Sequence, residues 1–314
     1  MRAEIGSTGG DRRPRDTGAG SGYARYLAAK TTVDDRALNR HVLAELKRLM
    51  PGDRPRVLEV GAGVGTMVAR LMDWDAIVAG DYILLDADRE LLDAARQWLC
   101  GWAAKRGLRS DLLPDGLEVG GLRVRLVHAE LGSYLEDAHR ASADVLIANA
   151  VLDLVHVPAV LPGLLELLIP GGAYWFTINY DAESTFVPGH PHDNQIMHAY
   201  HRDMDERIRF GRPAGESRTG RHMFHYLRDA GAPALAAGSS DWVVTAGPNG
   251  SYPNDEAYFL SSILSTIQSA LRDRQEWVTP ADLAGWLAER RRQLAAGELV
   301  YIAHQLDFAG RSPE

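Results

Sequence analysis

Apolar residues recur at intervals of three and four positions in the first third of the chain, as in Leu38, Val42, Leu46 and Leu49. This spacing predicts an amphipathic helix that the Pro51-Gly52 pair should end. The first 22 residues contain six glycines and four arginines without apolar periodicity. We therefore expect a flexible tail over 1–22 and an N-terminal helical cap over 23–52.

After Pro55, short apolar runs alternate with stretches of helical periodicity. Five runs are expected to form strands, at residues 56–60, 81–85, 122–128, 143–148 and 173–179. Helices are expected to begin near residue 65, to span 89–105 and to surround 161–168. Strands that alternate with helices indicate a parallel sheet covered on both faces. An α+β domain with the same elements in another order is the alternative.

The rest of the chain predicts one more helix and two closing strands, at residues 221–230, 242–245 and 299–306. Two stretches do not fit a minimal alternating core, at about 182–218 and about 247–297. The second should hold helices around 256–271 and 280–294. Both stretches are too long for plain connections, and loops of this size usually carry function or a lid.

The charge and the cysteine count narrow the class of protein. Among 314 residues, 34 are basic and 42 acidic, a net charge of −8 with histidine neutral. This balance disfavours non-specific binding to nucleic acid, although a local basic patch is compatible with it. The single cysteine, Cys100, excludes a disulfide framework, an iron–sulfur cluster and a cysteine-based zinc site. No apolar run approaches the roughly 20 residues of a membrane span, and the start lacks a signal peptide's apolar core, so a cytoplasmic protein without membrane contact is expected.

The strongest chemical signal is an apolar strand that runs into three alternating glycines and then a helix, with Gly61, Gly63 and Gly65 in the turn. A side chain here would block close approach of the backbone to a ligand, and the turn favours positive φ. The helix beyond offers unpaired N–H groups. Asp86, 21 residues after Gly65, ends the second strand, where a carboxylate can accept both hydroxyls of a ribose. A plain strand-to-helix turn is the alternative.

With these residues the chain resembles the class I S-adenosylmethionine-dependent methyltransferases. Glu59–Gly65 is similar to the family's E-x-G-x-G-x-G motif, and Tyr82–Asp88 is similar to its ribose-binding strand end. Three further segments also resemble the family: His128-Ala129-Glu130, Ala143–Leu152 and the proline–glycine turn Ile169-Pro170-Gly171-Gly172. It covers roughly residues 50–245 and the last strand, and it leaves out the two insertions.

The resemblance implies a cofactor-binding methyltransferase domain over 53–310. This domain would have a seven-stranded, mostly parallel sheet with helices on both faces, and the helical insertions would form a lid. It also implies S-adenosyl-L-methionine as cofactor and S-adenosyl-L-homocysteine as product. The residues that it places at the cofactor are Glu59, Gly61, Ala62, Gly63, Gly65, Asp86, Ala87, Ala129, Glu130 and Asn149.

The glycine spacing agrees with methyl transfer rather than hydride transfer. A dinucleotide fold uses G-x-G-x-x-G to bring a helix dipole onto a pyrophosphate. This chain has G-x-G-x-G, and a sulfonium cofactor has no phosphate. The charged methionine end of such a cofactor suits an acidic neighbour such as Glu59, acting through the loop or a water. In the cap, Tyr23, Tyr26 or Arg36 could reach the cofactor's carboxylate, and a solvated helix start is the alternative.

The residues after the fourth strand narrow the acceptor. The N6-adenine DNA enzymes of the family carry an Asn/Asp-Pro-Pro-aromatic motif there, whereas this chain has Asn149-Ala150-Val151-Leu152. No cysteine lies near this strand for a pyrimidine C5 mechanism. With the negative charge, these features favour a small-molecule acceptor of unknown nucleophilic atom over nucleic acid. A homodimer is compatible with the chain.

Four side chains are candidates for catalysis. Asp153 follows a rigid strand end, whereas Tyr180, His198 and His201 follow the fifth strand. Rigid groups hold geometry well, and a histidine can take a proton near neutral pH. The acceptor pocket is therefore expected between the end of the fourth strand and the segment 182–225.

Six histidines lie between residues 190 and 225 and allow three interpretations. One is a general base, the second a metal site with Asp193, Asp203 or Asp205, and the third a set of solvated histidines. No metal signature supports the second, so no metal is predicted.

Other hypotheses about function stay open. They are methylation of a macromolecule, an aminopropyl transferase with Asp153 as an acid, and a non-catalytic, cofactor-binding partner protein. The intact Glu59, Gly61, Gly63 and Asp86 disfavour the last.

Overall fold

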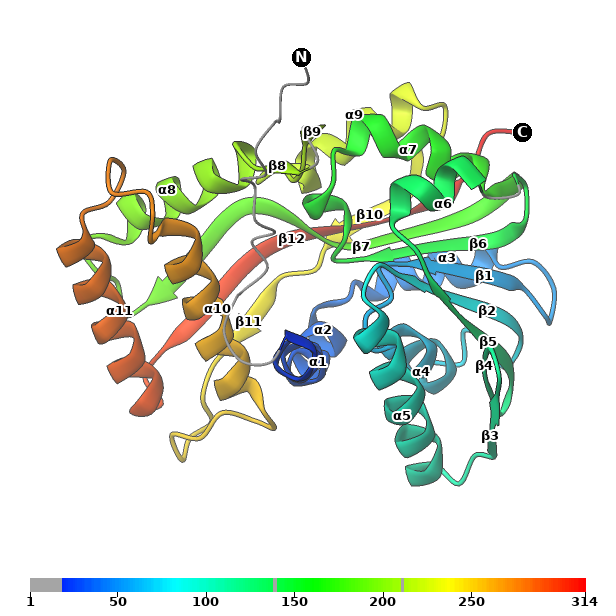
Figure 1. Ribbon diagram of the computed structural model, residues 1–314, viewed down its shortest axis with the longest axis horizontal. Coiled ribbons are helices and arrows are strands. Elements are labelled where there is room, and N and C mark those ends of the chain that lie inside the picture. The colour runs from blue at the N-terminus through cyan, green and yellow to red at the C-terminus, as the bar shows by residue number, and fades with distance from the viewer. Residues whose placement is uncertain (1–18, 138–139, 210–211) are drawn as a thin grey trace, which may run out of the picture.

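The computed structural model describes residues 19–314 except 138–139 and 210–211 (Figure 1). Its centre is a ten-stranded sheet with the order β10-β12-β7-β6-β1-β2-β5-β4-β3, in which β11 also pairs with β12. The strands of this sheet are β1 (Arg56–Val60), β2 (Ala79–Asp86), β3 (Ser110–Leu113), β4 (Gly116–Val119), β5 (Gly121–His128), β6 (Ala143–Asn149), β7 (Leu168–Val187), β10 (Ala234–Ser239), β11 (Trp242–Val244) and β12 (Val300–Arg311). A small separate ribbon pairs β8 (Ile208–Arg209) with β9 (Arg212–Pro213).

Five neighbouring strands of the sheet, β5, β2, β1, β6 and β7, run parallel. β12 is antiparallel to β7, and β10 is antiparallel to β12. These seven strands form a mostly parallel α/β core, which confirms the predicted fold class, but the predicted strand 242–245 is β11, and the outer position of the core is taken by β10. Parallel strands bring their carboxyl ends to one edge, where ligands of open α/β sheets bind.

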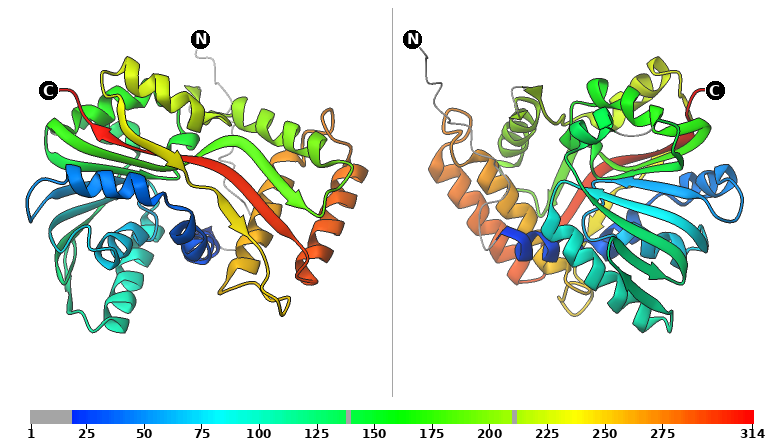
Figure 2. Two further views of the ribbon diagram at one scale, coloured as in Figure 1. Left: turned by 180° about the vertical axis from the view of Figure 1, so that it is seen from behind. Right: turned by 45° about the vertical axis from the view of Figure 1, so that its right-hand side comes forward.

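Helices cover both faces of the core (Figures 1 and 2). One face packs against α3 (Arg40–Leu49), α4 (Thr66–Asp73) and α5 (Arg89–Lys105), whose Leu46, Met67 and Leu99 are fully buried. The other packs against α7 (Val157–Glu166) and α9 (Thr219–Asp229), where Leu164 and Leu227 are fully buried, with α6 (Leu131–Asp137) beside α7. The apolar stripes that predicted these helices are therefore their buried faces.

The two longest strands extend beyond the core and carry a second group of helices. β7 and β12 pair as far as Val187 and Val300, and α8 (Asp193–Asp205), α10 (Glu256–Leu271) and α11 (Pro280–Ala295) gather around this extension (Figure 1). The ring of Phe186 meets that of Trp286 edge-on at 5.2 Å. We call α8, α10 and α11 the lid helices. Among the described helices, none has the length and apolar character to cross a membrane.

The structure differs from the sequence prediction at the N-terminal cap. Instead of one long helix, the chain forms α1 (Ala19–Ala29), α2 (Thr31–Ala37) and α3. Leu38 is extended, and the Asn39 side chain accepts the N–H groups of His41 and Val42 as the cap of α3. The predicted tail 1–22 lies mostly outside the described residues.

Several strands of the sheet differ from the prediction. β7 begins five residues earlier and ends eight residues later than expected, so the stretch from residue 182 starts inside a strand. The β3–β4 hairpin was not predicted, although Pro114-Asp115-Gly116 between apolar runs is a turn signal. The strand β10 was also missed, because Ala234–Ser239 is made of small residues with weak strand propensity.

Candidate functional site

The glycine turn joins β1 to α4 at the carboxyl edge of the sheet. Gly61, Gly63 and Gly65 have φ of +63°, +55° and +73°, the left-handed region that glycine adopts without strain. A Cβ on Gly61 would collide with the Val151 side chain, and a Cβ on Gly63 would lie 2.8 Å from Leu27 Cδ1. The turn therefore needs glycine both for its backbone angles and for the space above it.

The end of β2 is bonded directly to this turn. The Gly63 N–H donates to Asp86 Oδ2 and the Asp88 N–H to Asp86 Oδ1, each at 2.8 Å. The Ala62 N–H donates to the Leu85 carbonyl at 3.1 Å. Each carboxylate oxygen has a second lone pair, so Asp86 can hold the turn and still accept hydroxyl groups from a ligand.

The end of β5 lies beside Asp86, because Asp86 pairs with His128 in the sheet register. The Ala129 N–H donates to the Asp86 carbonyl at 3.1 Å, and His128 Nε2 lies 3.2 Å from the Ala87 carbonyl. The Glu130 side chain is exposed next to them. The structure thus brings together the predicted residues of the turn, Ala62, Asp86, Ala87, Ala129 and Glu130.

Glu59 lies buried below the turn. It is 2% exposed, and its Oε2 accepts the hydroxyl of Tyr82 at 2.9 Å. Burial raises the pKa of the Glu59 carboxyl to about 8, so the group is mostly neutral at pH 7. Glu59 thus joins β1 to β2 directly below the glycine turn.

Beyond β6, the chain turns toward the lid. Asn149 is half-buried, and its Oδ1 accepts the Thr177 hydroxyl at 2.9 Å. Ala150 has φ of +56°, and the short helix η1 (Leu152–Leu154) follows. Val151, two residues before Asp153, lies over Gly61. Burial raises the pKa of Asp153 to about 6.

Tyr180 and His201 are in direct contact. The Tyr180 hydroxyl lies 2.7 Å from His201 Nε2 and 2.9 Å from Ser184 Oγ, which lies 3.2 Å from the Tyr301 hydroxyl. Burial lowers the pKa of His201 below its ordinary value, so its ring is neutral at pH 7 and can accept a proton.

His198 is not part of this cluster. Its side chain is exposed, and its Nδ1 bonds the Asn194 carbonyl of the same helix at 2.8 Å. Three positions separate His198 from His201, yet only His201 faces β7. The structure brings together Tyr180 and His201 and leaves out His198.

The N-terminal helices pack against the glycine turn and the lid. Asp34 is fully buried and binds Lys30 Nζ at 3.1 Å and the indole N–H of Trp242 at 2.9 Å. Arg36 makes two bonds to Glu256 of α10, at 2.7 and 2.8 Å. Arg36 is therefore paired with the lid, rather than directed at a cofactor carboxylate as the sequence suggested.

Several residues at this site were missed from the sequence. Leu27 looks like an ordinary apolar position, and no motif marks it. A weak signal existed for Lys30, because an i,i+4 pair with Asp34 places both on one helix face. The partners of Tyr180 on β12 depend on strand register, which the sequence pattern does not give.

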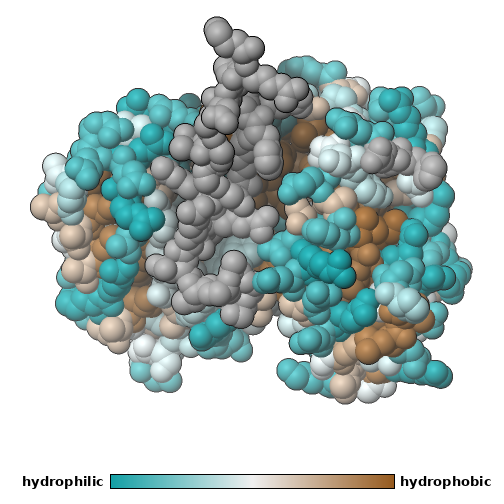
Figure 3. Space-filling model, in the orientation of Figure 1, coloured by the Kyte–Doolittle hydropathy of each residue, from teal (hydrophilic) through white to brown (hydrophobic). Residues whose placement is uncertain are grey.

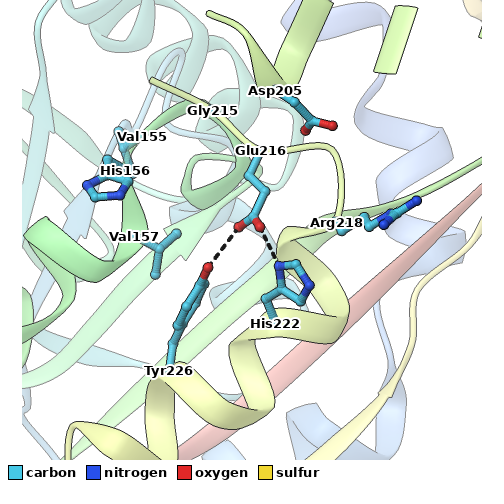
Figure 4. Close-up of a pocket in the computed structure, with 9 residues that line it drawn as sticks. All are labelled: Val155, His156, Val157, Asp205, Gly215, Glu216, Arg218, His222 and Tyr226. Atoms are coloured by element: carbon cyan, nitrogen blue, oxygen red, sulfur yellow. Dashed lines mark hydrogen bonds and ion pairs between the residues drawn. The ribbon is translucent and has the colours of Figure 1, made fainter. Parts of the chain in front are cut away.

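A hydrophilic cavity of about 300 Å³ lies between η1, α7 and α9 (Figure 4). Its wall is formed by Val155, His156, Val157, Asp205, Gly215, Glu216, Arg218, His222 and Tyr226. Glu216 accepts His222 Nδ1–H and, at 3.2 Å, the Tyr226 hydroxyl. None of these residues belongs to the glycine turn. Within the described part of the chain, no three His, Cys, Asp or Glu side chains are grouped to hold a metal ion.

A second cavity, of about 560 Å³, has a more apolar lining that includes Leu58, Ile83, Val127 and Tyr134. Figure 3 shows hydrophobic side chains gathered over β2 and β5 on the face drawn there. Arg56, Asp81 and Arg125 also line this cavity, which has no residue in common with the glycine turn or Tyr180.

No protein-family model matches the chain, and no curated protein matches it. Among solved structures, it is similar to an S-adenosylmethionine-dependent methyltransferase from Thiobacillus denitrificans in complex with S-adenosyl-L-homocysteine. The identity is 14% over 90% of this chain and 97% of the other, with a TM-score of 0.43. It is also similar to phosphoethanolamine N-methyltransferase 2 from Haemonchus contortus in complex with S-adenosyl-L-methionine, at 11% identity over 93% of this chain and 57% of the other, with a TM-score of 0.44.

At these values, the likeness carries no argument about activity or substrate. The evidence for the fold is the order of the strands in this chain, with β5-β2-β1-β6-β7 parallel, β12 antiparallel beside β7 and β10 outermost. This arrangement is the mostly parallel sheet with helices on both faces that the resemblance to the class I S-adenosylmethionine-dependent methyltransferases implies.

Proposed function

We propose that the chain is an S-adenosylmethionine-dependent methyltransferase that acts on a small molecule. The observation that carries the proposal is the glycine turn, in which three left-handed glycines end β1 and the Gly63 amide is bonded to Asp86. A plain strand-to-helix turn does not need a carboxylate of the next strand at its centre.

The residues at the turn fit an adenosine with a sulfonium side chain. Gly61 and Gly63 carry no Cβ, and a Cβ there would collide with the side chains of Val151 and Leu27 that pack on the turn. Asp86 would accept the ribose hydroxyls, and the backbone at Ala87 and Ala129 would border the adenine. Asn149 would lie on the other side of the turn, at the end of β6. When bound, S-adenosylmethionine supplies an electrophilic methyl group.

The chain's own residues would then position the acceptor and move its proton. The neutral His201 would accept a proton through the Tyr180 hydroxyl, which lies 2.7 Å from its Nε2. Ser184 and Tyr301 would hold that hydroxyl in place, because Ser184 Oγ bonds both. Asp153 would contact the acceptor from the β6 side. Cytoplasmic location and a homodimer stay predictions from the sequence.

Calorimetric titration tests the cofactor half of the proposal. S-adenosyl-L-homocysteine should bind saturably and one molecule per chain, whereas NAD should give no binding heat because the turn lacks a pyrophosphate site. Binding of NAD without binding of S-adenosyl-L-homocysteine would overturn the proposal.

A methyl-transfer assay distinguishes an enzyme from a non-catalytic partner protein. The purified chain is incubated with S-adenosyl-L-methionine that carries a deuterated methyl group and with a bacterial metabolite extract. A labelled product of small mass and the release of S-adenosyl-L-homocysteine are expected. Cofactor binding without any labelled small molecule would favour the partner protein or a macromolecular acceptor.

A further inference from the structure

Lys30 is a buried lysine at the junction of α1 and α2. It is 6% exposed, and its Nζ lies 3.1 Å from Asp34 Oδ2 and 5.2 Å from the centre of the Trp242 ring. A lysine is rarely buried unless its charge is paired. An ammonium has three N–H groups, and among the described residues Lys30 is paired with no carboxylate other than Asp34. Lys30 can therefore donate to a second acceptor.

The carboxylate of Asp34 is shared among three donors. Its Oδ2 also lies 3.4 Å from Arg70 Nη2, and its Oδ1 accepts the indole N–H of Trp242 at 2.9 Å. Arg70 has a second carboxylate, because its Nε donates to Asp35 Oδ1 at 2.6 Å. Within the part of the chain that the structure describes, Lys30 has no such second carboxylate. Of the two buried cations, Lys30 is therefore the one with room for the charge of a ligand.

Two paths of contacts place Lys30 beside the glycine turn. Leu27 lies three positions before Lys30, on the same face of the helix, and its Cδ1 is 2.8 Å from the position that a Cβ on Gly63 would take. The helix is unbroken between the two, because the Lys30 N–H donates to the carbonyl four positions before it at 3.0 Å. On the other side, Arg70, which shares a carboxylate with Lys30, donates to Thr66 Oγ1 at 3.0 Å. Thr66 is the first residue of α4 after the turn, so Lys30 is anchored at both sides of it.

We propose that Lys30 binds the carboxylate of the cofactor's methionine end. This inference rests on the proposed function and assigns a residue to the negatively charged group of the cofactor. The Lys30 ammonium would keep its bond to Asp34 and donate its other N–H groups to the carboxylate oxygens. Such charge-assisted bonds are strong where water is excluded. Arg36, the cation of the cap that the sequence suggested for this role, is bonded twice to Glu256 instead, at 2.7 and 2.8 Å.

Two ligands that differ only in the carboxylate test the proposal by calorimetric titration. They are S-adenosyl-L-homocysteine and its decarboxylated form, S-adenosyl-3-thiopropylamine, which keeps the adenosine, the sulfur and the amine. The wild-type chain should bind S-adenosyl-L-homocysteine more tightly by about 10-fold or more, because the decarboxylated form leaves the buried ammonium without its second acceptor. Equal affinity for the two ligands would overturn the proposal. Binding of neither ligand would contradict the proposed function itself.

Substitution of Lys30 assigns the preference to this side chain. Lys30→Gln, which keeps an N–H donor for Asp34, should bind S-adenosyl-L-homocysteine about 10-fold more weakly and the decarboxylated form within twofold of the wild type. Lys30→Met, which keeps most of the length of the side chain without its charge, should give the same result. Arg36→Gln is the matched control in the cap and should keep the wild-type preference between the two ligands.

Two results with these variants would overturn the proposal. An equal loss of affinity for both ligands in the Lys30 variants would mean that Lys30 only supports the structure of the cap. A preference that is kept in the Lys30 variants and lost in Arg36→Gln would assign the carboxylate to Arg36.

Discussion

The glycine turn is held mainly by bonds between backbone groups, with one bond to the Asp86 carboxylate, whereas the cluster around Tyr180 is held by side chains. At the turn, the N–H groups of Ala62 and Gly63 bond β2, and Ala129 bonds the Asp86 carbonyl, all within 3.1 Å. Around Tyr180, by contrast, the bonds join side chains. The Tyr180 hydroxyl on β7 bonds Ser184 and the imidazole of His201 on α8, and Ser184 bonds the Tyr301 hydroxyl on β12. Bonds between backbone groups do not depend on which side chains are present. The glycine turn can therefore keep its structure while the side chains around Tyr180 change to suit another substrate.

The N-terminal helices connect the two halves. Leu27 of α1 packs on Gly63, and Tyr26 of the same helix stacks on Phe259 of α10 at 5.8 Å. The buried Asp34 ties Lys30 to Trp242 of β11. A change at the turn should therefore affect cofactor binding directly, whereas a change in the lid should affect turnover first.

The largest effect is expected from Gly63→Val. A valine at φ of +55° is strained, and its Cβ would lie 2.8 Å from Leu27. Affinity for S-adenosyl-L-homocysteine should fall by about 100-fold or more, measured by calorimetry. Gly101→Val in α5 is the matched control, because nothing lies within 4 Å of its Cβ position, and it should keep the affinity. Equal losses in both variants would mean that the turn is not the binding site.

Substitution of His201 should separate turnover from binding. His201→Ala and Tyr180→Phe should each lower kcat by roughly 100-fold with unchanged affinity for S-adenosyl-L-homocysteine. His198→Ala, on the exposed side of the same helix, should behave as wild type. Loss of activity in His198→Ala but not in His201→Ala would contradict the assignment.

The pH profile gives a second test of His201. Because burial disfavours the imidazolium, the pKa of His201 is below its ordinary value, and the base form persists in more acidic solution. The acidic limb of kcat should therefore lie below pH 6.5, the ordinary histidine pKa. A limb above that value would identify another base.

Asp86→Ala should weaken binding less than Gly63→Val. It removes charge-assisted hydrogen bonds to the ribose, worth about 1.5–3 kcal/mol each before water replaces them, and the bond from the Gly63 N–H. We expect a loss of S-adenosyl-L-homocysteine affinity of roughly 10- to 100-fold in calorimetry. An unchanged dissociation constant in a folded variant would remove Asp86 from the cofactor site.

The two halves also differ in how well the sequence predicts them. The turn, Asp86 and the alternating strands follow from local patterns, because glycine spacing and a strand-end carboxylate are close in sequence. The Tyr180–His201–Tyr301 cluster depends on the length of β7 and its register with β12, which bring residues over 100 positions apart into contact. His198 and His201 look equivalent in sequence, and only the packing of α8 on β7 distinguishes them.

The smallest effect is expected from Glu59→Gln, and it tests whether the charge of Glu59 acts on the cofactor. The motif places an acid before the glycines, which suggests a charge for the cofactor's ammonium. In the fold, Glu59 is enclosed with the Tyr82 hydroxyl, and its pKa of about 8 keeps it neutral at pH 7. A glutamine can accept the same bond, so affinity for S-adenosyl-L-methionine should change by less than about twofold at pH 7. A loss of tenfold or more, absent from Tyr82→Phe, would mean that Glu59 is ionised and acts on the ligand, and that the turn depends on side-chain charge as much as on its backbone.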